Sequence, residues 1–129
     1  MRLMSTALVA LVLSAGVAAA EFTLGFDWGD IPRCASGRPN TVGSPAFVLR
    51  GVPAGTTTIQ FRLKDLNVPS YNHGGGTVKV GRDGKLPFGV FKYKSPCPPG
   101  GTHTYEWTAT ARSGNSTLAT AKARRKYPE

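Results

Sequence analysis

The sequence has few of the residues that build catalytic or metal centres. Its 129 residues include only 2 cysteines, 2 histidines and 7 acidic residues. Neither cysteine has the C-x-x-C partner typical of zinc sites, and no segment has the lysine and hydroxyl spacing of a phosphate-binding P-loop. Ser70 and Ser95 lie outside any recognisable nucleophile elbow. We therefore expect a protein that is not an enzyme and holds no cofactor.

Long helical periodicity is also missing. Short stretches of alternating apolar and polar residues recur between turns rich in Gly, Pro, Ser and Asn. This pattern predicts an all-β, mainly antiparallel fold, a small sandwich or barrel without repeats or linkers. A hairpin turn is expected at 82–85, and a short helix is the alternative for the last segment because alanine and lysine favour helix. The expected strands are 22–28, 44–50, 56–64, 77–80, 86–94, 102–111 and 118–127.

The one long apolar run lies at the N-terminus. Arg2 precedes an almost wholly apolar stretch at 7–17, and the three alanines at 18–20 fit an A-x-A cleavage site. The run is short for a membrane span, so an uncleaved anchor is the weaker alternative. We expect a signal peptide at 1–20, a single mature domain at 21–129, and a periplasmic or secreted location.

The two cysteines, Cys34 and Cys97, allow only one intramolecular pairing. An exported chain with an even number of cysteines favours a disulfide. Such a bridge would fasten the N-terminal part of the chain to the Pro/Gly-rich loop at 95–101. That loop leads into a strand whose first inward residue is His103. The bridge would therefore hold the loop in place above the His103 side chain. A histidine in this place suits a binding site, and a histidine that caps the core is the alternative.

The charge is strongly positive. There are 16 basic and 7 acidic residues, a formal net charge of +9. Such a surface attracts anions, acidic lipid headgroups or nucleic acid. Outside the cytoplasm we expect small phosphates or phospholipid headgroups and no nucleic acid. The last expected strand has a basic outer face that runs from Lys122 to Lys126, which suits contact with a membrane surface. A charge that serves solubility alone is the alternative.

Several stretches, taken in order, resemble one known family. They are Ser44-Pro45, then Gly-Val-Pro-Ala-Gly-Thr at 51–56, Asp-Leu-Asn-Val-Pro at 65–69, and Ser-Pro-Cys-Pro-Pro-Gly-Gly-Thr-His-Thr-Tyr at 95–105. The chain resembles the phosphatidylethanolamine-binding proteins, in their bacterial Raf-kinase-inhibitor-like branch. The resemblance implies a lipid-binding β-sandwich with a small anion pocket at one end. The chain is shorter than typical members, so we expect the C-terminal helix that flanks the pocket to be missing.

The resemblance also implies site residues. The family builds its pocket from an Asp-Pro-Asp-x-Pro segment, a central histidine, and a Gly-x-His-Arg segment after a Pro-Pro loop. Asp65 stands at the first aspartate, and Asn67 replaces the second. His103 keeps the last histidine, Thr104 replaces the arginine, and His73 is the candidate for the central histidine. The expected ligand-binding residues are Asp65, Asn67, His73, Pro98, Gly101 and His103.

The function expected from these residues is non-enzymatic binding of a small anion, phosphate or a phospholipid headgroup. Protonated imidazoles would strengthen it, and the glycines at 74–76 and 100–101 would offer backbone N–H groups. One alternative is a metal-binding or hydrolytic site built on Asp65, His73 and His103. The other is a basic β-sandwich module that binds a protein or a polyanion.

Overall fold

The computed structural model describes residues 10, 20–35 and 37–129. The expected signal peptide, at 1–20, therefore lies outside the described residues except for two positions. The described part of the chain is built of β-strands, and it contains no helix long and apolar enough to cross a membrane. The strands are β1 (Thr23–Asp27), β2 (Thr41–Gly43), β3 (Ala46–Arg50), β4 (Thr58–Asp65), β5 (Gly75–Val78), β6 (Gly84–Leu86), β7 (Lys92–Lys94), β8 (His103–Ser113) and β9 (Ser116–Tyr127).

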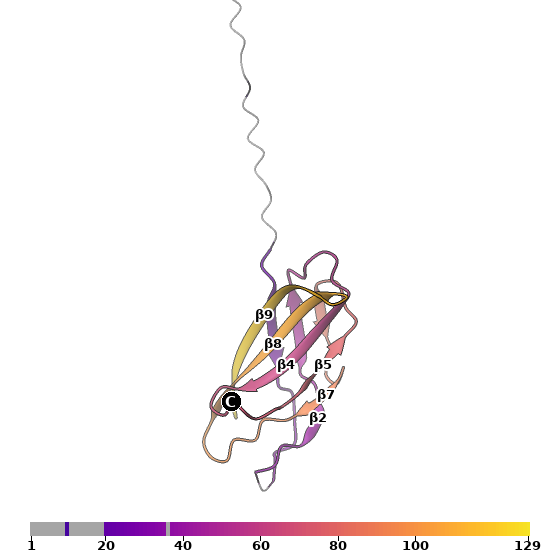
Figure 1. Ribbon diagram of the computed structural model, residues 1–129. Helices are drawn as coiled ribbons and strands as arrows, with labels where there is room; N and C mark the ends of the chain where they lie inside the picture. Colours follow the sequence, from indigo (N-terminus) through magenta and orange to yellow (C-terminus); the bar gives the residue numbers. More distant parts are fainter. Residues whose placement is uncertain (1–9, 11–19, 36) are drawn as a thin grey trace, which may run out of the picture.

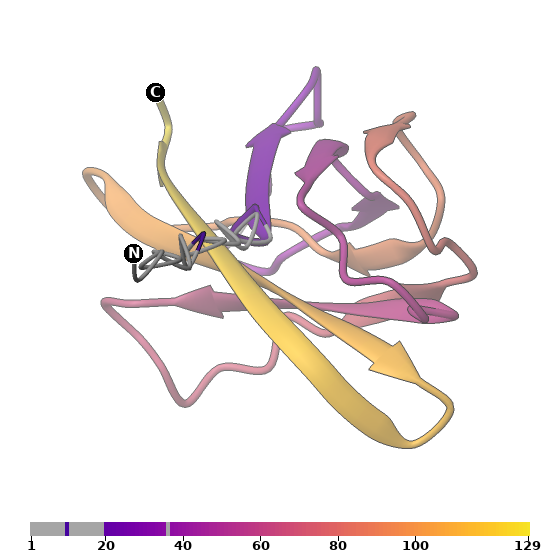
Figure 2. The same ribbon diagram turned by 90° about the horizontal axis from the view of Figure 1, so that it is seen from above.

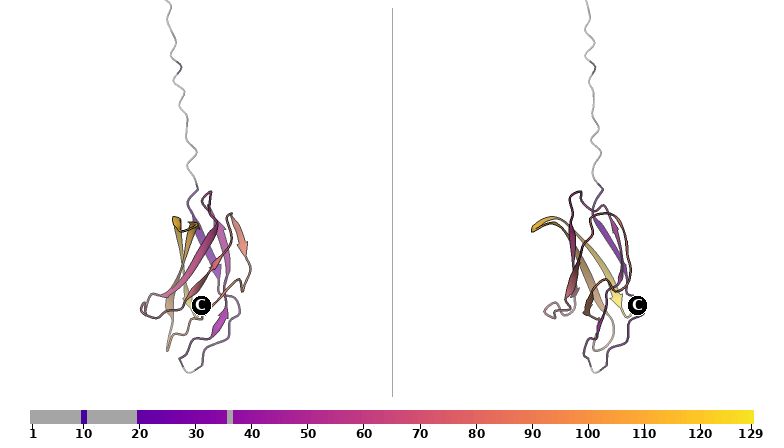
Figure 3. Two further views of the ribbon diagram at one scale, coloured as in Figure 1. Left: turned by 45° about the vertical axis from the view of Figure 1, so that its right-hand side comes forward. Right: turned by 90° about the vertical axis from the view of Figure 1, so that its right-hand side faces the viewer.

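Two antiparallel sheets form the sandwich (Figure 1). One sheet has the strand order β1-β3-β6 and the other β5-β4-β8-β9, while β2 and β7 pair separately. The long β8–β9 hairpin extends beyond its neighbours, as Figures 2 and 3 show. The expected all-β fold is confirmed. The last segment is the strand β9 rather than the short helix that was its alternative, which agrees with the expected lack of a C-terminal helix.

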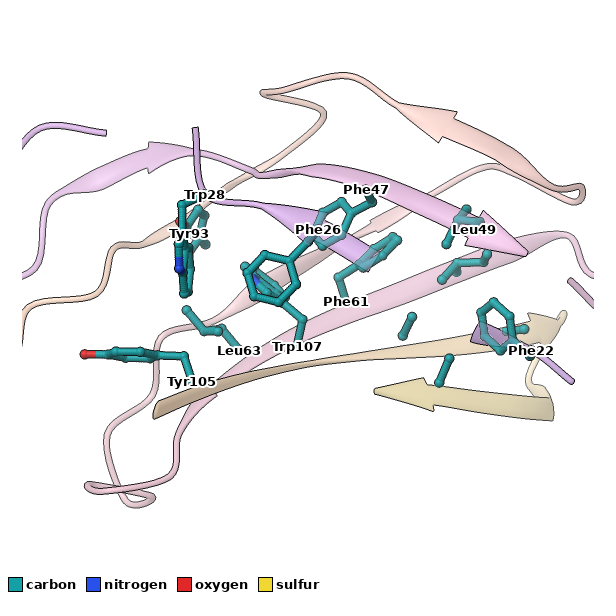
Figure 4. Packing of buried hydrophobic residues seen from close by; sticks show 14 of the residues in the cluster. Phe22, Phe26, Trp28, Phe47, Leu49, Phe61, Leu63, Tyr93, Tyr105 and Trp107 are labelled. Atoms are coloured by element: carbon teal, nitrogen blue, oxygen red, sulfur yellow. The ribbon is translucent and has the colours of Figure 1, made fainter. Parts of the chain in front are cut away.

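The core lies between the two large sheets and consists mainly of aromatic rings (Figure 4). Phe47 of β3 stacks on Phe61 of β4 with ring centroids 4.4 Å apart, and it meets Trp107 of β8 edge to face at 5.3 Å. All three side chains are fully buried. They occupy inward positions of strands along which inward and outward residues alternate. Burying one such side chain stabilises the fold by roughly 2–3 kcal/mol. The alternation therefore fixes which face each strand turns to the core.

The expected hairpin at 82–85 is wrong. β5 pairs with β4, whereas β6 pairs with β3 in the opposite sheet, so the segment between them crosses the sandwich. Asp83 explains the crossing, because its carboxylate accepts hydrogen bonds from the amides of Gly51 (3.0 Å) and Val52 (2.8 Å). These bonds fasten residue 83 to the turn that follows β3, away from β5.

Two of the three glycines at 74–76, Gly75 and Gly76, are required by packing. Gly75 and Gly76 belong to β5 and pair with β4, so the expected loop at 70–76 ends earlier. A Cβ on Gly75 would stand 1.8 Å from the carbonyl oxygen of Phe61, and one on Gly76 would stand 2.5 Å from the ring of Phe91. Only glycine allows this close approach of two strands and an aromatic ring.

Candidate functional site

Two loops meet at one end of the sandwich and are fastened together. Cys34 and Cys97 form the expected disulfide, with Cα atoms 5.7 Å apart. Two further bonds join the same loops: the Asn40 amide donates to Ser95 Oγ (3.0 Å), and the Ser95 amide donates to the Asn40 carbonyl (2.8 Å). Ser95 is fully buried in this clamp, which removes it as a nucleophile. A stable disulfide indicates a compartment outside the reducing cytoplasm.

Asp65, which is buried, and His103, which is partly buried, form a pair beneath these loops. Asp65 ends β4 and His103 begins β8, and the His103 Nδ1 lies 2.7 Å from the Asp65 Oδ2. The other carboxylate oxygen accepts the amides of Asn67 (2.9 Å) and Val68 (3.3 Å). Burial acts to raise the pKa of Asp65, but these hydrogen bonds, led by that from His103, hold it below its usual value. Asp65 is therefore ionised at neutral pH and orients the His103 ring.

His73 is held by a different partner. Its Nδ1 lies 2.7 Å from the Lys94 carbonyl oxygen, so Nδ1 carries the hydrogen and donates. The Lys94 amide in turn donates to the His73 carbonyl at 2.8 Å, which fixes the loop before β5 against β7. Burial lowers the pKa of His73 despite the bond to Lys94 and the nearby Asp65 charge. His73 is thus neutral at neutral pH, and its Nε2 is an acceptor.

Tyr105 lies between the two histidines. Its ring centroid is 5.6 Å from that of His73 and 6.3 Å from that of His103. The ring and its Oη are fully buried, and the Cys97 backbone and the Asp65 side chain lie near Oη without forming a hydrogen bond of good geometry to it. Figure 4 shows this hydroxyl pointing away from the packed core rings. Burial, and to a lesser extent the Asp65 charge, raises the pKa of Tyr105 against the opposing effect of the Cys97 backbone, so the hydroxyl keeps its proton and remains a donor.

These groups line a pocket of about 240 Å³. No hydrogen bond is formed by the Nε2 atom of either histidine within the described part of the chain. The polar groups in the pocket wall are therefore the two histidine Nε2 atoms, the phenols of Tyr71 and Tyr105, and the Asp65 carboxylate. The remaining lining is apolar or backbone. The full lining is Gly37, Pro39, Asp65, Val68, Tyr71, His73, Cys97, Pro99, His103 and Tyr105.

Three of the six expected ligand residues meet in this pocket: Asp65, His73 and His103. Pro98 and Gly101 instead line a separate hollow of about 310 Å³ behind the same loop. That hollow carries charges of both signs from Arg33 and Glu129, and Tyr127 and Pro128 also line it. It therefore shows no preference for an anion.

Asn67 is a bracing residue in this structure. Its Oδ1 accepts the amide of Thr104 at 2.9 Å, which ties the loop after β4 to the beginning of β8. The side chain does not line the pocket. Its own amide donates to Asp65, so Asn67 supports the carboxylate through the backbone.

The sequence reasoning missed Tyr105, Tyr71 and the loop residues Gly37 and Pro39 as pocket residues. Tyr105 could have been found, because it shares the inward face of β8 with His103. Tyr71, whose ring contacts that of His73 at 4.5 Å, stands two residues before a recognised candidate. Gly37 and Pro39 had no local signal and reach the pocket through the loop that holds Cys34.

A metal centre finds no support in this geometry. Among the described residues, no three His, Cys, Asp or Glu side chains are placed to hold a metal ion. Both histidines use Nδ1 for bonds within the protein, and both oxygens of Asp65 are engaged. The alternative of a metal site on Asp65, His73 and His103 is therefore not favoured.

Comparison with known proteins identifies the fold. No protein-family model matches the chain, and no curated protein matches its sequence. Among solved structures, it is similar to a phosphatidylethanolamine-binding protein homologue from Chlamydia trachomatis, with 19% sequence identity and a TM-score of 0.53. The match covers 67% of this chain and 82% of the other. The described chain thus has a fold like that of the phosphatidylethanolamine-binding proteins.

Proposed function

We propose that this chain is a non-enzymatic binding protein, exported after removal of residues 1–20, that binds a phosphate-bearing anion. The observation that carries the proposal is the convergence of His73, His103 and Tyr105 on one pocket, where neither histidine Nε2 forms a hydrogen bond within the described residues and the buried Tyr105 hydroxyl forms none of good geometry. Free phosphate and a phospholipid headgroup share this chemistry. The motif at 95–105 also leads us to infer membership of the bacterial Raf-kinase-inhibitor-like branch.

Each group has a defined part in the proposed complex. The Tyr105 hydroxyl donates to an anionic oxygen. His103 donates from Nε2 when protonated, and the Asp65 carboxylate then balances its charge. Neutral His73 accepts at Nε2, so it suits a ligand hydrogen such as a phosphate P–OH. Protonation of His73 turns this acceptor into a donor, so lower pH should favour a fully ionised anion.

The test is a calorimetric titration with phosphate and phosphoethanolamine. Tyr105→Phe should weaken binding about tenfold or more, because a hydrogen bond to a charged group is lost. The fold should be unharmed, since the removed hydroxyl has no partner among the described residues. Tyr93→Phe is the matched control: it also removes a buried hydroxyl without a described partner, but it does not line this pocket. Equal affinities for the two variants would contradict the proposal.

A further inference from the structure

The positive charge is concentrated on the outer face of the four-stranded sheet, the side nearest the viewer in Figure 1. Inward residues of β4, β8 and β9 fill the core, so the alternate residues face outward. Six outward positions are basic, and one, Glu106, is acidic. We call these six the basic face: Arg62, Lys64, Arg112, Lys122, Arg124 and Lys126.

The opposite sheet has no such face. Its outward positions on β1, β3 and β6 carry two basic residues, Arg50 and Lys85, and one acidic residue, Asp27. The remaining outward positions there are small or uncharged. The charge of the sandwich is therefore asymmetric, which a solubility role does not require.

The one acidic residue among these outward positions, Glu106, does not neutralise the basic face. Glu106 is buried beneath its neighbours, with Arg124 Nε at 2.8 Å and Lys122 Nζ at 3.9 Å. Arg62, Lys64 and Lys126 are exposed and form no ion pair within the described part of the chain. These three cations are available to an external anion.

We propose that the basic face docks on an anionic phospholipid membrane. The cations spread over three adjacent strands as a two-dimensional patch, which suits a planar array of headgroups better than one linear polymer. The other outward positions are mostly threonines, without the aromatic side chains on which single-stranded nucleic acid stacks. Each lysine or arginine near an anionic bilayer strengthens binding roughly fivefold.

A second feature favours lipid. The loop that leaves β4 directly after Lys64 and Asp65 exposes Val68 and Tyr71, at 41% and 40%. Apolar and tyrosine side chains beside cations are typical of the membrane interface. Val68 and Tyr71 also line the pocket, but none of the six cations of the basic face does. The two proposals can therefore be tested separately through the cations.

The test is co-sedimentation of disulfide-intact protein with vesicles of phosphatidylcholine, with and without phosphatidylglycerol. We expect binding only to the anionic vesicles, weakening as salt rises. Removing three charges in Arg62→Gln/Lys64→Gln/Lys126→Gln should weaken it about a hundredfold. The control Arg50→Gln/Lys85→Gln/Lys92→Gln removes as many charges elsewhere and should have little effect.

Two further measurements separate the outcomes. His103→Ala should bind vesicles normally but lose phosphate, and the triple variant of the basic face should do the reverse. Equal losses in the two triple variants would mean that net charge alone acts, which overturns the proposal. No binding to anionic vesicles overturns it too, as does a preference for a soluble polyanion such as heparin over vesicles.

Discussion

At the scale of the residue, the two histidines differ in the group that holds their Nδ1 atom. His103 is paired with a carboxylate, whereas His73 is buried against a carbonyl. Both keep Nε2 for the pocket, but only His103 has a charge partner in direct contact. A single anion therefore meets one histidine beside a carboxylate and another, His73, whose lowered pKa resists protonation.

The environment of His73 gives a pH dependence of stability. Because burial lowers its folded-state pKa, the unfolded chain binds the proton more readily. Stability from this residue is complete above the unfolded value of about 6.5 and is lost as pH falls through the folded value. Asp65, whose pKa is also lowered, adds a second loss at more acidic pH, below about 4.

Urea unfolding in phosphate-free buffer should therefore show a lower free energy of unfolding at about pH 5 than at about pH 7.5. His73→Asn, which keeps a donor for the Lys94 carbonyl but does not titrate, should reduce this difference. A pH dependence that is unchanged in His73→Asn would show that another group causes it.

The limit of sequence reasoning at this scale lies in the direction of hydrogen bonds. Asp65, His73 and His103 could be named because their residue types and the loop pattern are informative. Asn67 could not be assigned correctly from its type, since only the fold shows that its amide oxygen is used by Thr104. Tyr105 could be predicted to face inward. That its hydroxyl forms no hydrogen bond of good geometry depends on how the core is assembled.

At the scale of the element, the strands follow from alternation, but their partners do not. The inward and outward faces of β4 and β8 could be predicted residue by residue. The pairing of β6 with β3 could not, because it depends on the contacts of Asp83 with a turn more than thirty residues earlier. Local turn residues favour a hairpin, and a long-range hydrogen bond overrules them.

The β4–β5 pairing should be unusually sensitive to substitution. Gly75→Ala would place a methyl group against the Phe61 carbonyl oxygen and should destabilise the protein by about 3 kcal/mol, as overpacking does. Gly74→Ala is the control, since its site is open and only the positive φ of 76° opposes it, at about 1 kcal/mol. Thermal unfolding of both variants measures the difference. Equal losses would contradict the close approach of the two strands.

At the scale of the whole molecule, the disulfide joins stability to the site. It links two loops 63 residues apart in sequence, and both supply walls of the pocket. Neither wall has a regular element to hold it. The Asn40–Ser95 bonds remain when the bridge is cut, so the sheets should persist while the pocket loosens.

Cys34→Ser/Cys97→Ser should lower the free energy of unfolding by about 4 kcal/mol on the chain-entropy model. Phosphate affinity should fall as well, because Cys97 and Pro99 no longer stand fixed beside the histidines. Chemical reduction of the unaltered protein should give the same two changes. Full phosphate affinity in the reduced protein would show that the bridge stabilises the fold without shaping the pocket.

The fold class, the disulfide and the inward faces could all be predicted from the sequence, because each rests on a local pattern or a forced pairing. The separation of Pro98 and Gly101 from the histidines could not, since it depends on which side of one loop faces the pocket. The basic outer face of the last strand could be predicted, but its union with Arg62, Lys64 and Arg112 on one sheet could not, because it follows from strand pairing.

The most direct test of the anion pocket is nitrogen NMR of the two histidine rings during a titration with phosphate, repeated with sulfate, which keeps its charge near neutral pH. We predict saturable shifts of Nε2 in both rings, with Nδ1 little changed because the bonds to Asp65 and Lys94 persist. Sulfate should bind more tightly at lower pH. Unmoved ring nitrogens, with shifts confined to lysines and arginines of the basic face, would contradict the account.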